Sequence, residues 1–384
     1  MADLSSDVER RELTFLERIR SVTWGLVALI LLAAGFGIVV LYSAADGNMQ
    51  PWAATQTVRL AVALVLMIGA ALLGIRLWFR AAYWAYAIVL ALVIAVDLRG
   101  FIGMGARRWI DLGALQLQPS QLMNVALVLA LSRYFHTFSD EEIVRIRFLV
   151  APALMVLVPT ALVLKEPDLG TAVMLVMTGT VLFFIAGVRL RIFAVMAAGL
   201  TAVVPIGWHL LRDYQKNRIY TFLDPQSDPL GAGYHILQSQ IALGSGGLVG
   251  KGFLNGTQSH LSFLPEKQTD FIFTTLAEEF GFVGGLGLLA LYALIVGYGF
   301  VIALRCRNHF GRLLGLGILT NFSLYVFINI AMVMGLIPVV GVPLPLISYG
   351  GTALVAMMFG MSLLLNVGVH QNTRLNRRGE IQPG

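Results

Sequence analysis

Long stretches without a charged residue recur along this chain and constrain its fold more than any other feature. A bilayer core is about 30 Å thick, so a helix needs about 20 mostly apolar residues to cross it. The last stretch, 313–373, is split by the proline-rich segment 338–347 into halves at about 313–337 and 349–370. The other eight stretches are 21–45, 60–75, 81–96, 113–132, 148–164, 169–188, 192–211 and 280–304. Ten segments result, of which 60–75 and 81–96 are short and must use flanking residues or a thinner bilayer.

These stretches predict an all-α polytopic membrane protein with about ten transmembrane helices. Only 12% of the residues are charged, against about 25% in an average soluble domain, so a soluble protein with buried core helices is a poor alternative. The net charge of +6 is clustered between apolar runs, and we do not expect nucleic-acid binding. We treat residues 1–384 as one membrane domain, consisting of a cytoplasmic tail at 1–20, helices 1–7 in 21–211, a large extracytoplasmic loop at 212–270 between helices 7 and 8, helices 8–10 in 271–370 and a cytoplasmic tail at 371–384.

The distribution of basic residues predicts the orientation. If the N-terminus is cytoplasmic, 17 of the 27 basic residues lie in inside segments, as the positive-inside rule expects. Five of the other ten lie in the long loop 212–270, where that rule weakens. An even number of helices places both termini in the cytoplasm. The single cysteine, Cys306, and six scattered histidines have no metal-ligand spacing, so we assign no metal-binding residues.

The polar residues that could support chemistry lie in three segments on the predicted outer side, namely 98–119, 165–171 and 212–270. In the first, Arg107 and Arg108 precede Trp109. Tryptophan favours the headgroup zone, which fits simple anchoring, but two arginines here oppose the positive-inside bias and fit an anionic ligand. The second segment carries a charged cluster that fits a local salt bridge, formed by Lys165, Glu166 and Asp168.

The third segment is predicted to contain short helices at 214–223 and 233–243, followed by the glycine-rich stretch 244–256. That stretch is not a nucleotide-binding loop, because the Walker pattern needs glycine at Ser245 and a hydroxyl residue at Gly252. Two interpretations remain open. The glycines form tight turns only, or their N–H groups approach an anion with Lys251 nearby.

Asp270 lies where the eighth membrane helix is expected to begin, because Pro265, Glu266 and Thr269 are helix-start signals. It fits an N-cap or first-turn carboxylate, or a reactive carboxylate at the membrane surface. On a continuous helix Glu278 would lie about 80° around and about 12 Å along the axis from Asp270, so the two would not be a close pair. Glu278 and its neighbour Glu279 are expected to face protein or water rather than lipid.

Several motifs together carry a resemblance to the SEDS family, the shape, elongation, division and sporulation proteins. They span nearly the whole chain and are GARRWIDLG (105–113), LQPSQ (117–121), EPDLGT (166–171), DPLGAGYHILQSQIALGSGGLVGKG (228–252), GTQSHLSFLPEKQTDFIF (256–273), AEEFG (277–281) and PVVGVPLPLISYGGTA (338–353). The GTQ at 256–258 is more similar to the elongation branch than to the division branch.

The resemblance implies a peptidoglycan glycosyltransferase that polymerises lipid II, an undecaprenyl-pyrophosphate-linked disaccharide pentapeptide, for cell elongation and rod shape. It implies the outer face of the bacterial cytoplasmic (inner) membrane as the place of reaction, and a class B penicillin-binding protein as the transpeptidase partner. Membrane lipids surround the chain. A divalent cation is the one cofactor left open.

The family's essential acidic residue falls on Asp270, and its functional arginine and tryptophan fall on Arg108 and Trp109. Where the family often has glutamate and lysine, this chain has Gln121 and Asn124, so a charged pair is not transferred. The predicted catalytic residue is Asp270, as general base. The predicted substrate-binding residues are Arg108, Trp109, Lys251, Lys267, Glu266, Gln121 and Asn124, with Arg108, Lys251 or Lys267 near the pyrophosphate.

Two other functions compete with this interpretation. A transporter or flippase of lipid-linked precursors would place binding groups near the bilayer midplane, whereas the polar groups here crowd the outer rim. A non-catalytic scaffold for a cell-wall complex would tolerate replacement of Asp270.

Overall fold

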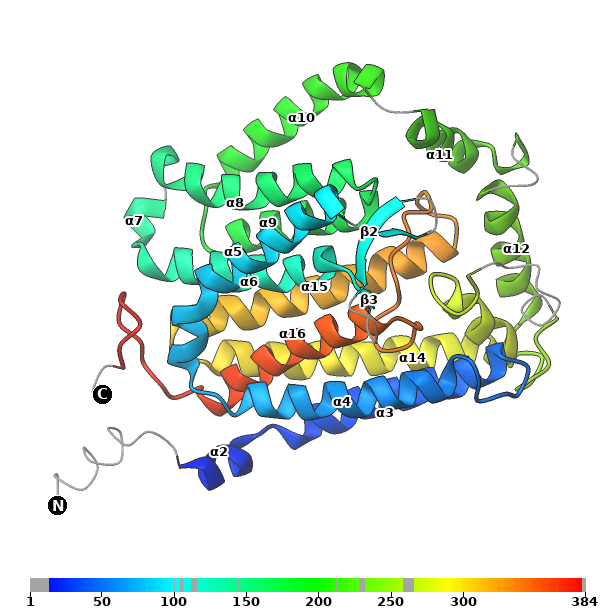
Figure 1. Cartoon of the computed structure of the whole chain (residues 1–384), viewed down its shortest axis with the longest axis horizontal. Coiled ribbons are helices and arrows are strands. Elements are labelled where there is room, and N and C mark those ends of the chain that lie inside the picture. Colours follow the sequence, from blue (N-terminus) through cyan, green and yellow to red (C-terminus); the bar gives the residue numbers. More distant parts are fainter. Residues whose placement is uncertain are drawn as a thin grey trace.

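Each of the ten uncharged stretches corresponds to one long helix in the computed structural model (Figure 1). The structure describes residues 14–99, 101–103, 106–111, 116–143, 145–210, 213–227, 232–257 and 266–381. The long helices are α3 (Trp24–Ala44), α4 (Ala53–Ala71), α5 (Ile75–Arg99), α6 (Pro119–Thr137), α8 (Ile146–Lys165), α9 (Leu169–Ile185), α10 (Leu190–Leu210), α14 (Ile272–Arg305), α15 (His309–Val333) and α16 (Gly351–Val369). The short stretches 60–75 and 81–96 reach helical length by including Arg59, Arg76 and Arg80.

Seven helices in the described part of the chain are long and apolar enough to cross a membrane, namely α3, α4, α5, α8, α14, α15 and α16. The helix α9 and the first part of α10 are apolar but shorter. Most residues of α6 are buried among the other helices, including Ser120, Gln121 and Asn124. A helix enclosed in this way can carry polar residues, because protein rather than lipid surrounds them. The number of ten transmembrane helices therefore stays a prediction.

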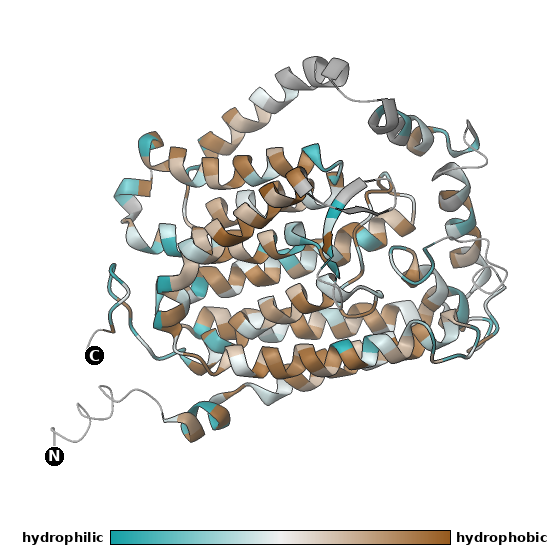
Figure 2. Cartoon of the chain, in the orientation of Figure 1, coloured by the Kyte–Doolittle hydropathy of each residue, from teal (hydrophilic) through white to brown (hydrophobic). Residues whose placement is uncertain are grey.

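The core lies where α6, α15 and α16 pack together, and α4, α5, α9 and α14 surround them. Many large apolar side chains point outward from the surrounding helices, such as Val65 on α4 and Trp84 on α5, which are 72% and 74% exposed. Figure 2 shows hydrophobic residues along the long helices and hydrophilic residues concentrated towards their ends and in the loops. Such an apolar outer surface fits a protein surrounded by lipid.

The segment 98–119 contains a small antiparallel sheet, which the sequence analysis did not predict. Its strands are β1 (Phe101–Gly103), β2 (Ala106–Asp111) and β3 (Gln116–Leu117), in the order β1-β2-β3. Trp109 is opposite Phe101, and Ile110 is opposite Leu117. Strands of two to six residues are too short to show a sequence period, so the chain is mostly rather than entirely helical.

The two ends of the bundle differ in what they carry. Figure 1 places the short helices α2 (Phe15–Ser21) and α7 (Asp140–Ile143) at one end, together with the C-terminal segment that follows α16. The opposite end, called the loop end here, carries the sheet and the predicted short helices α11 (Asp213–Leu223) and α12 (Ala232–Ser245), with the 3-10 helix η1 (Pro225–Ser227) between them.

The helix α14 departs from the sequence expectation in two ways. It begins at Ile272 with Phe271 as its N-cap, so Asp270 precedes the helix, and the interpretation of Asp270 as an N-cap or first-turn residue is wrong. The helix is also interrupted at Gly281, whose φ of 65° and ψ of −162° are not helical. The interruption lies after Glu278, so residues 272–280 form one continuous part of the helix, which Asp270 precedes.

Candidate active site

Asp270 lies at the loop end, between α14, α15 and the proline-rich segment 338–347. Its backbone carbonyl accepts a hydrogen bond of 2.9 Å from Nδ2 of Asn329 on α15. The same Nδ2 donates to the carbonyl of Val342 at 2.7 Å. A Cβ added to Gly341 would lie 3.4 Å from Oδ2 of Asp270, so the carboxylate borders this segment directly. Asp270 is therefore half-buried at a point where three separate parts of the chain meet.

The turn that leads into α14 is attached to the segment before α16. The hydroxyl of Ser348 donates to the Thr269 carbonyl at 2.7 Å, and the Tyr349 N–H donates to the Gln268 carbonyl at 2.8 Å. Within the turn, Oε2 of Glu266 accepts a hydrogen bond of 2.9 Å from the Thr269 hydroxyl. Glu266, a predicted substrate-binding residue, therefore helps to shape the turn that presents Asp270. Pro265 lies outside the described residues.

Two cationic side chains lie at this turn, Lys267 within it and Arg59 beside it. Lys267 is only 8% exposed, and its ammonium is 5.9 Å from the ring centroid of Trp52. The guanidinium of Arg59 is 4.8 Å from the ring centroid of Tyr349, and a Cβ on Gly351 would lie 3.2 Å from it. The faces of aromatic rings attract cations, so these contacts fix the positions of both charged groups. The sequence analysis missed Arg59, although it is the one charged residue within α4 and could have been noticed for that reason.

Arg108 joins two of the segments that the sequence analysis treated separately. Its Nε donates to the Glu166 carbonyl at 3.0 Å, and a terminal nitrogen donates to the Pro167 carbonyl. Carbonyl groups orient a guanidinium but leave its positive charge uncompensated. Trp109, the next residue, is half-buried in β2. The side chain of Arg107 lies outside the described part of the structure.

Replacing Arg108 with Lys should loosen the sheet while leaving the bundle folded. An ammonium cannot reproduce the forked contact with two carbonyls, and losing one charged hydrogen bond costs about 1–2 kcal/mol at a half-buried site. Hydrogen exchange of the β2 amides should rise about tenfold. Arg147→Lys is the control, because the Arg147 guanidinium lies 4.7 Å from the ring centroid of Phe148 and away from the sheet's carbonyl partners. Equal hydrogen exchange of the β2 amides in both variants would contradict the role of Arg108 in holding the sheet.

The expectation of a salt bridge in the segment 165–171 is wrong for Asp168, whose carboxylate is bound by neutral donors instead. Asp168 is the N-cap of α9, and its Oδ1 accepts from the Thr171 N–H at 3.2 Å. Its Oδ2 accepts from the Thr171 hydroxyl at 2.8 Å, from Gln118 at 3.1 Å and from Ser120 at 3.3 Å. These neutral donors satisfy the carboxylate, and they fix the start of α6 against α9.

Gln121 and Asn124 belong to a neutral hydrogen-bonded chain inside the bundle. Nδ2 of Asn124 donates to the Tyr325 hydroxyl at 3.2 Å, and that hydroxyl donates to Oε1 of Gln121 at 2.7 Å. Gln121 and Tyr325 line a narrow cavity together with Asn321 and the segment 343–348. This cavity therefore adjoins the proline-rich segment that borders Asp270.

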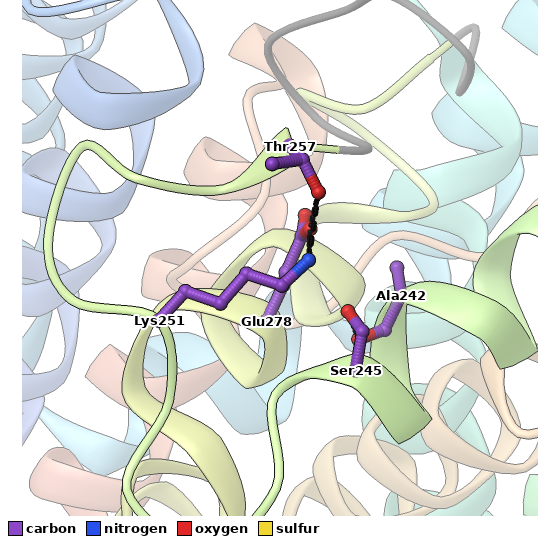
Figure 3. Close-up of polar contacts among 5 residues, drawn as sticks. All are labelled: Ala242, Ser245, Lys251, Thr257 and Glu278. Atoms are coloured by element: carbon purple, nitrogen blue, oxygen red, sulfur yellow. Dashed lines mark hydrogen bonds and ion pairs between the residues drawn. The ribbon is translucent and has the colours of Figure 1, made fainter.

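Lys251 is placed beside Glu278 (Figure 3). Its ammonium is 2.7 Å from Oε1 of Glu278 and 2.7 Å from the Thr257 hydroxyl, which is 3.0 Å from the same oxygen. Glu278 and Glu279 are 0% and 1% exposed, which confirms that they face protein. Among the residues that the structure describes, no three His, Cys, Asp or Glu side chains gather into a metal-binding group.

Comparisons with known proteins show the family of the chain. A family model described as "Cell cycle protein", of FtsW, RodA and SpoVE, matches residues 23–373. The chain is 45% identical over 314 residues to peptidoglycan glycosyltransferase MrdB of Escherichia coli K12, covering 82% of this chain and 84% of that protein. It is 35% identical over 354 residues to stage V sporulation protein E of Bacillus subtilis, covering 89% and 95% of the two chains.

Solved structures share the fold. A chain from a study of how a peptidoglycan synthase complex coordinates polymerization and crosslinking has a TM-score of 0.79 and 34% identity, covering 90% of this chain and 97% of that one. The rod shape determining protein RodA of Thermus thermophilus has a TM-score of 0.69 and 31% identity, covering 91% and 97%. The chain belongs to the FtsW/RodA/SpoVE family of cell cycle proteins, the SEDS family to which its motifs pointed.

Proposed function

We propose that this protein is a peptidoglycan glycosyltransferase that polymerises lipid II in cell elongation, with Asp270 as general base. The observation that carries this proposal is the position of Asp270. Its half-buried carboxylate lies at the loop end, where the turn 266–271, α15 and the segment 338–347 meet. The 45% identity to a peptidoglycan glycosyltransferase supports the activity.

The proposed reaction forms a glycosidic C–O bond, breaks the C–O bond to the pyrophosphate and transfers one proton. A sugar hydroxyl of one lipid-linked saccharide attacks the anomeric carbon of another, Asp270 takes the hydroxyl proton, and the pyrophosphate leaves with the electron pair of the broken C–O bond. A single displacement inverts the anomeric centre. A positioned base contributes about 10²–10⁴ in rate.

Cationic groups near Asp270 would stabilise the charge on the departing pyrophosphate. We assign this role to Lys267 and Arg59, which lie at the turn carrying Asp270, and to Arg108, whose charge is not cancelled by its carbonyl partners. Trp109 is assigned to the same outer surface. Gln121 lines the adjoining cavity, and Asn124 donates to Tyr325, which also lines it. The ammonium of Lys251 is instead paired with Glu278.

The reaction is proposed to take place on the extracytoplasmic face of the inner membrane. In this orientation the loop end faces outward, the loop 212–270 is extracytoplasmic, and both termini are cytoplasmic. The positive-inside distribution of arginines supports this orientation. The position of α2 and the C-terminal segment at the opposite end of the bundle agrees with it (Figure 1).

A class B penicillin-binding protein with a single membrane helix is the proposed partner. A structural relative comes from a synthase complex that coordinates polymerization and crosslinking. An apolar groove between α14 and α15 could receive such a helix, and its lining includes Tyr292, Ala293, Val296, Phe327 and Ile330. Small residues on such faces allow close helix packing in membranes.

A reconstituted assay separates polymerisation from transport. The full chain with its transpeptidase partner, in liposomes containing fluorescent lipid II, should build glycan strands that are visible by gel electrophoresis. It should not speed the exchange of lipid II between leaflets above the rate of empty liposomes. Rapid exchange without strand formation would favour the flippase and overturn the proposed function.

A further inference from the structure

A loop from elsewhere in the chain replaces the turn that is missing at the kink of α14. In an unbroken helix the N–H groups of Phe282 and Val283 would donate to carbonyls four residues earlier. Gly281 interrupts that pattern. The two N–H groups instead donate to Gly247 at 2.9 Å and to Leu248 at 3.1 Å.

The carbonyls released by the kink are satisfied by the same loop. The carbonyl of Glu278 accepts a hydrogen bond of 3.0 Å from the Lys251 N–H, and the carbonyl of Glu279 accepts one of 3.0 Å from the Gly252 N–H. Every helical backbone partner lost at these four positions is therefore supplied by residues 246–252. We call this segment the glycine clasp.

The close approach requires glycine on both sides. A Cβ on Gly246 would lie 2.1 Å from the Ala277 carbonyl oxygen, and one on Gly250 would lie 2.1 Å from the Glu279 carbonyl oxygen. A Cβ on Gly281 would lie 2.3 Å from the Gly250 nitrogen. Gly250 and Gly281 also have φ of +81° and +65°, a region that side chains disfavour. The pattern explains the glycine-rich stretch as a backbone contact to α14.

An ion pair between side chains also connects the glycine clasp to α14 (Figure 3). The Lys251 ammonium donates to Oε1 of Glu278 and to the Thr257 hydroxyl, both at 2.7 Å. The Thr257 hydroxyl donates to the same Oε1 at 3.0 Å. Glu278 is fully buried and Lys251 is 26% exposed. A buried carboxylate is costly without a partner, so this ion pair holds the glycine clasp against the kink.

We propose that Lys251 and Glu278 are positioning residues for glycosyl transfer. Their ion pair locks the glycine clasp across the kink and so fixes the direction of 272–280, the part of α14 that begins two residues after Asp270. Lys251 acts through Glu278 and does not bind the pyrophosphate. This inference rests on the proposed function, since it needs Asp270 to be the group that is positioned.

A double-mutant cycle on the full chain with its transpeptidase partner tests the inference. The variants are Lys251→Met, Glu278→Gln and the double variant, with kcat and KM for lipid II measured for each. Lys251→Met leaves a buried carboxylate unpaired, so its kcat should fall at least about tenfold. KM should stay within about twofold. Adding Glu278→Gln should restore part of the lost kcat, because it removes the uncompensated charge.

A lysine that binds the pyrophosphate directly would give a different result in these variants. If Lys251 bound the substrate directly, Lys251→Met would raise KM, and its effect would multiply with that of Glu278→Gln; either result overturns the inference. Lys251→Arg keeps the ion pair and should retain kcat within about twofold. Lys251→Arg also serves as the test if Lys251→Met does not fold. A large loss of kcat in folded Lys251→Arg would contradict the inference.

Two controls separate the possible failures. The exposed ion pair of Arg377 and Glu142, 3.8 Å apart, is the matched pair for neutral substitutions and should leave kcat unchanged. Asp270→Asn is run beside it. Wild-type turnover by Asp270→Asn would defeat the proposed function itself. An inactive Asp270→Asn together with multiplying effects at Lys251 and Glu278 would defeat only the positioning role.

Discussion

Replacing Asp270 with Asn should reduce the rate of lipid II polymerisation by a factor of about 10²–10⁴. The amide keeps the size of the side chain but cannot accept the proton of the attacking hydroxyl. The backbone contact from Asn329 to the Asp270 carbonyl does not depend on the carboxylate, so the turn should stay in place. The variant should therefore fold, associate with its partner and bind lipid II while failing to extend strands. Gel analysis of strand formation measures the loss.

Asp224→Asn is the matched control for this substitution. Asp224 directly follows α11, which lies at the same end of the bundle (Figure 1). Its exposed carboxylate accepts a hydrogen bond of 3.2 Å from the Gln226 N–H. Its replacement should leave polymerisation within about twofold of wild type. Comparable losses in the two variants would indicate general damage to the loops rather than removal of a base.

Gly250→Ala should produce the second large effect, on stability as well as on activity. The new methyl group would meet the Glu279 carbonyl oxygen at 2.1 Å, at a residue whose φ is +81°. The left-handed backbone alone costs about 1–2 kcal/mol, and displaced clasp hydrogen bonds cost about 1 kcal/mol each. The purified protein should melt several degrees lower and polymerise lipid II more slowly.

Gly244→Ala provides the comparison in the last turn of α12, directly before the glycine clasp. A Cβ there meets nothing within 4 Å, and alanine favours a helix more than glycine does, so the change should lower neither the melting temperature nor the activity. An unchanged melting temperature in Gly250→Ala would mean that the glycine clasp does not support the kink. A lower melting temperature in Gly244→Ala would mean that any added methyl group near the glycine clasp destabilises the protein, whatever its contacts.

The sequence predicted the helices well because the scarcity of charge is a strong local signal. It predicted the short helices at 214–223 and 233–243 for a similar reason, since apolar spacing is visible within one segment. The kink at Gly281 was not predictable, because the sequence AEEFG is compatible with a regular helix. The kink depends on hydrogen bonds to the glycine clasp, which lies elsewhere in the sequence. Local patterns therefore gave the elements but not the contacts between them.

In the candidate site, too, the sequence indicated individual residues but not their contacts. Motif resemblance singled out Asp270 and Arg108, but the partners of each lie far away in the chain, at Asn329 and at Glu166. Lys251 was assigned to pyrophosphate because a lysine in a glycine-rich loop suggests an anion site. Its pairing with Glu278, 27 residues later, depends on tertiary contact that no local pattern encodes.

A structure of the Asp270→Asn variant with lipid II bound would show whether residue 270 reaches the acceptor sugar. We expect the acceptor hydroxyl within about 2.6–3.2 Å of the side chain at position 270. We also expect the pyrophosphate of the second lipid to contact Lys267 and Arg59. Lipid II bound in a site from which residue 270 cannot reach any sugar hydroxyl would show that Asp270 is not the general base.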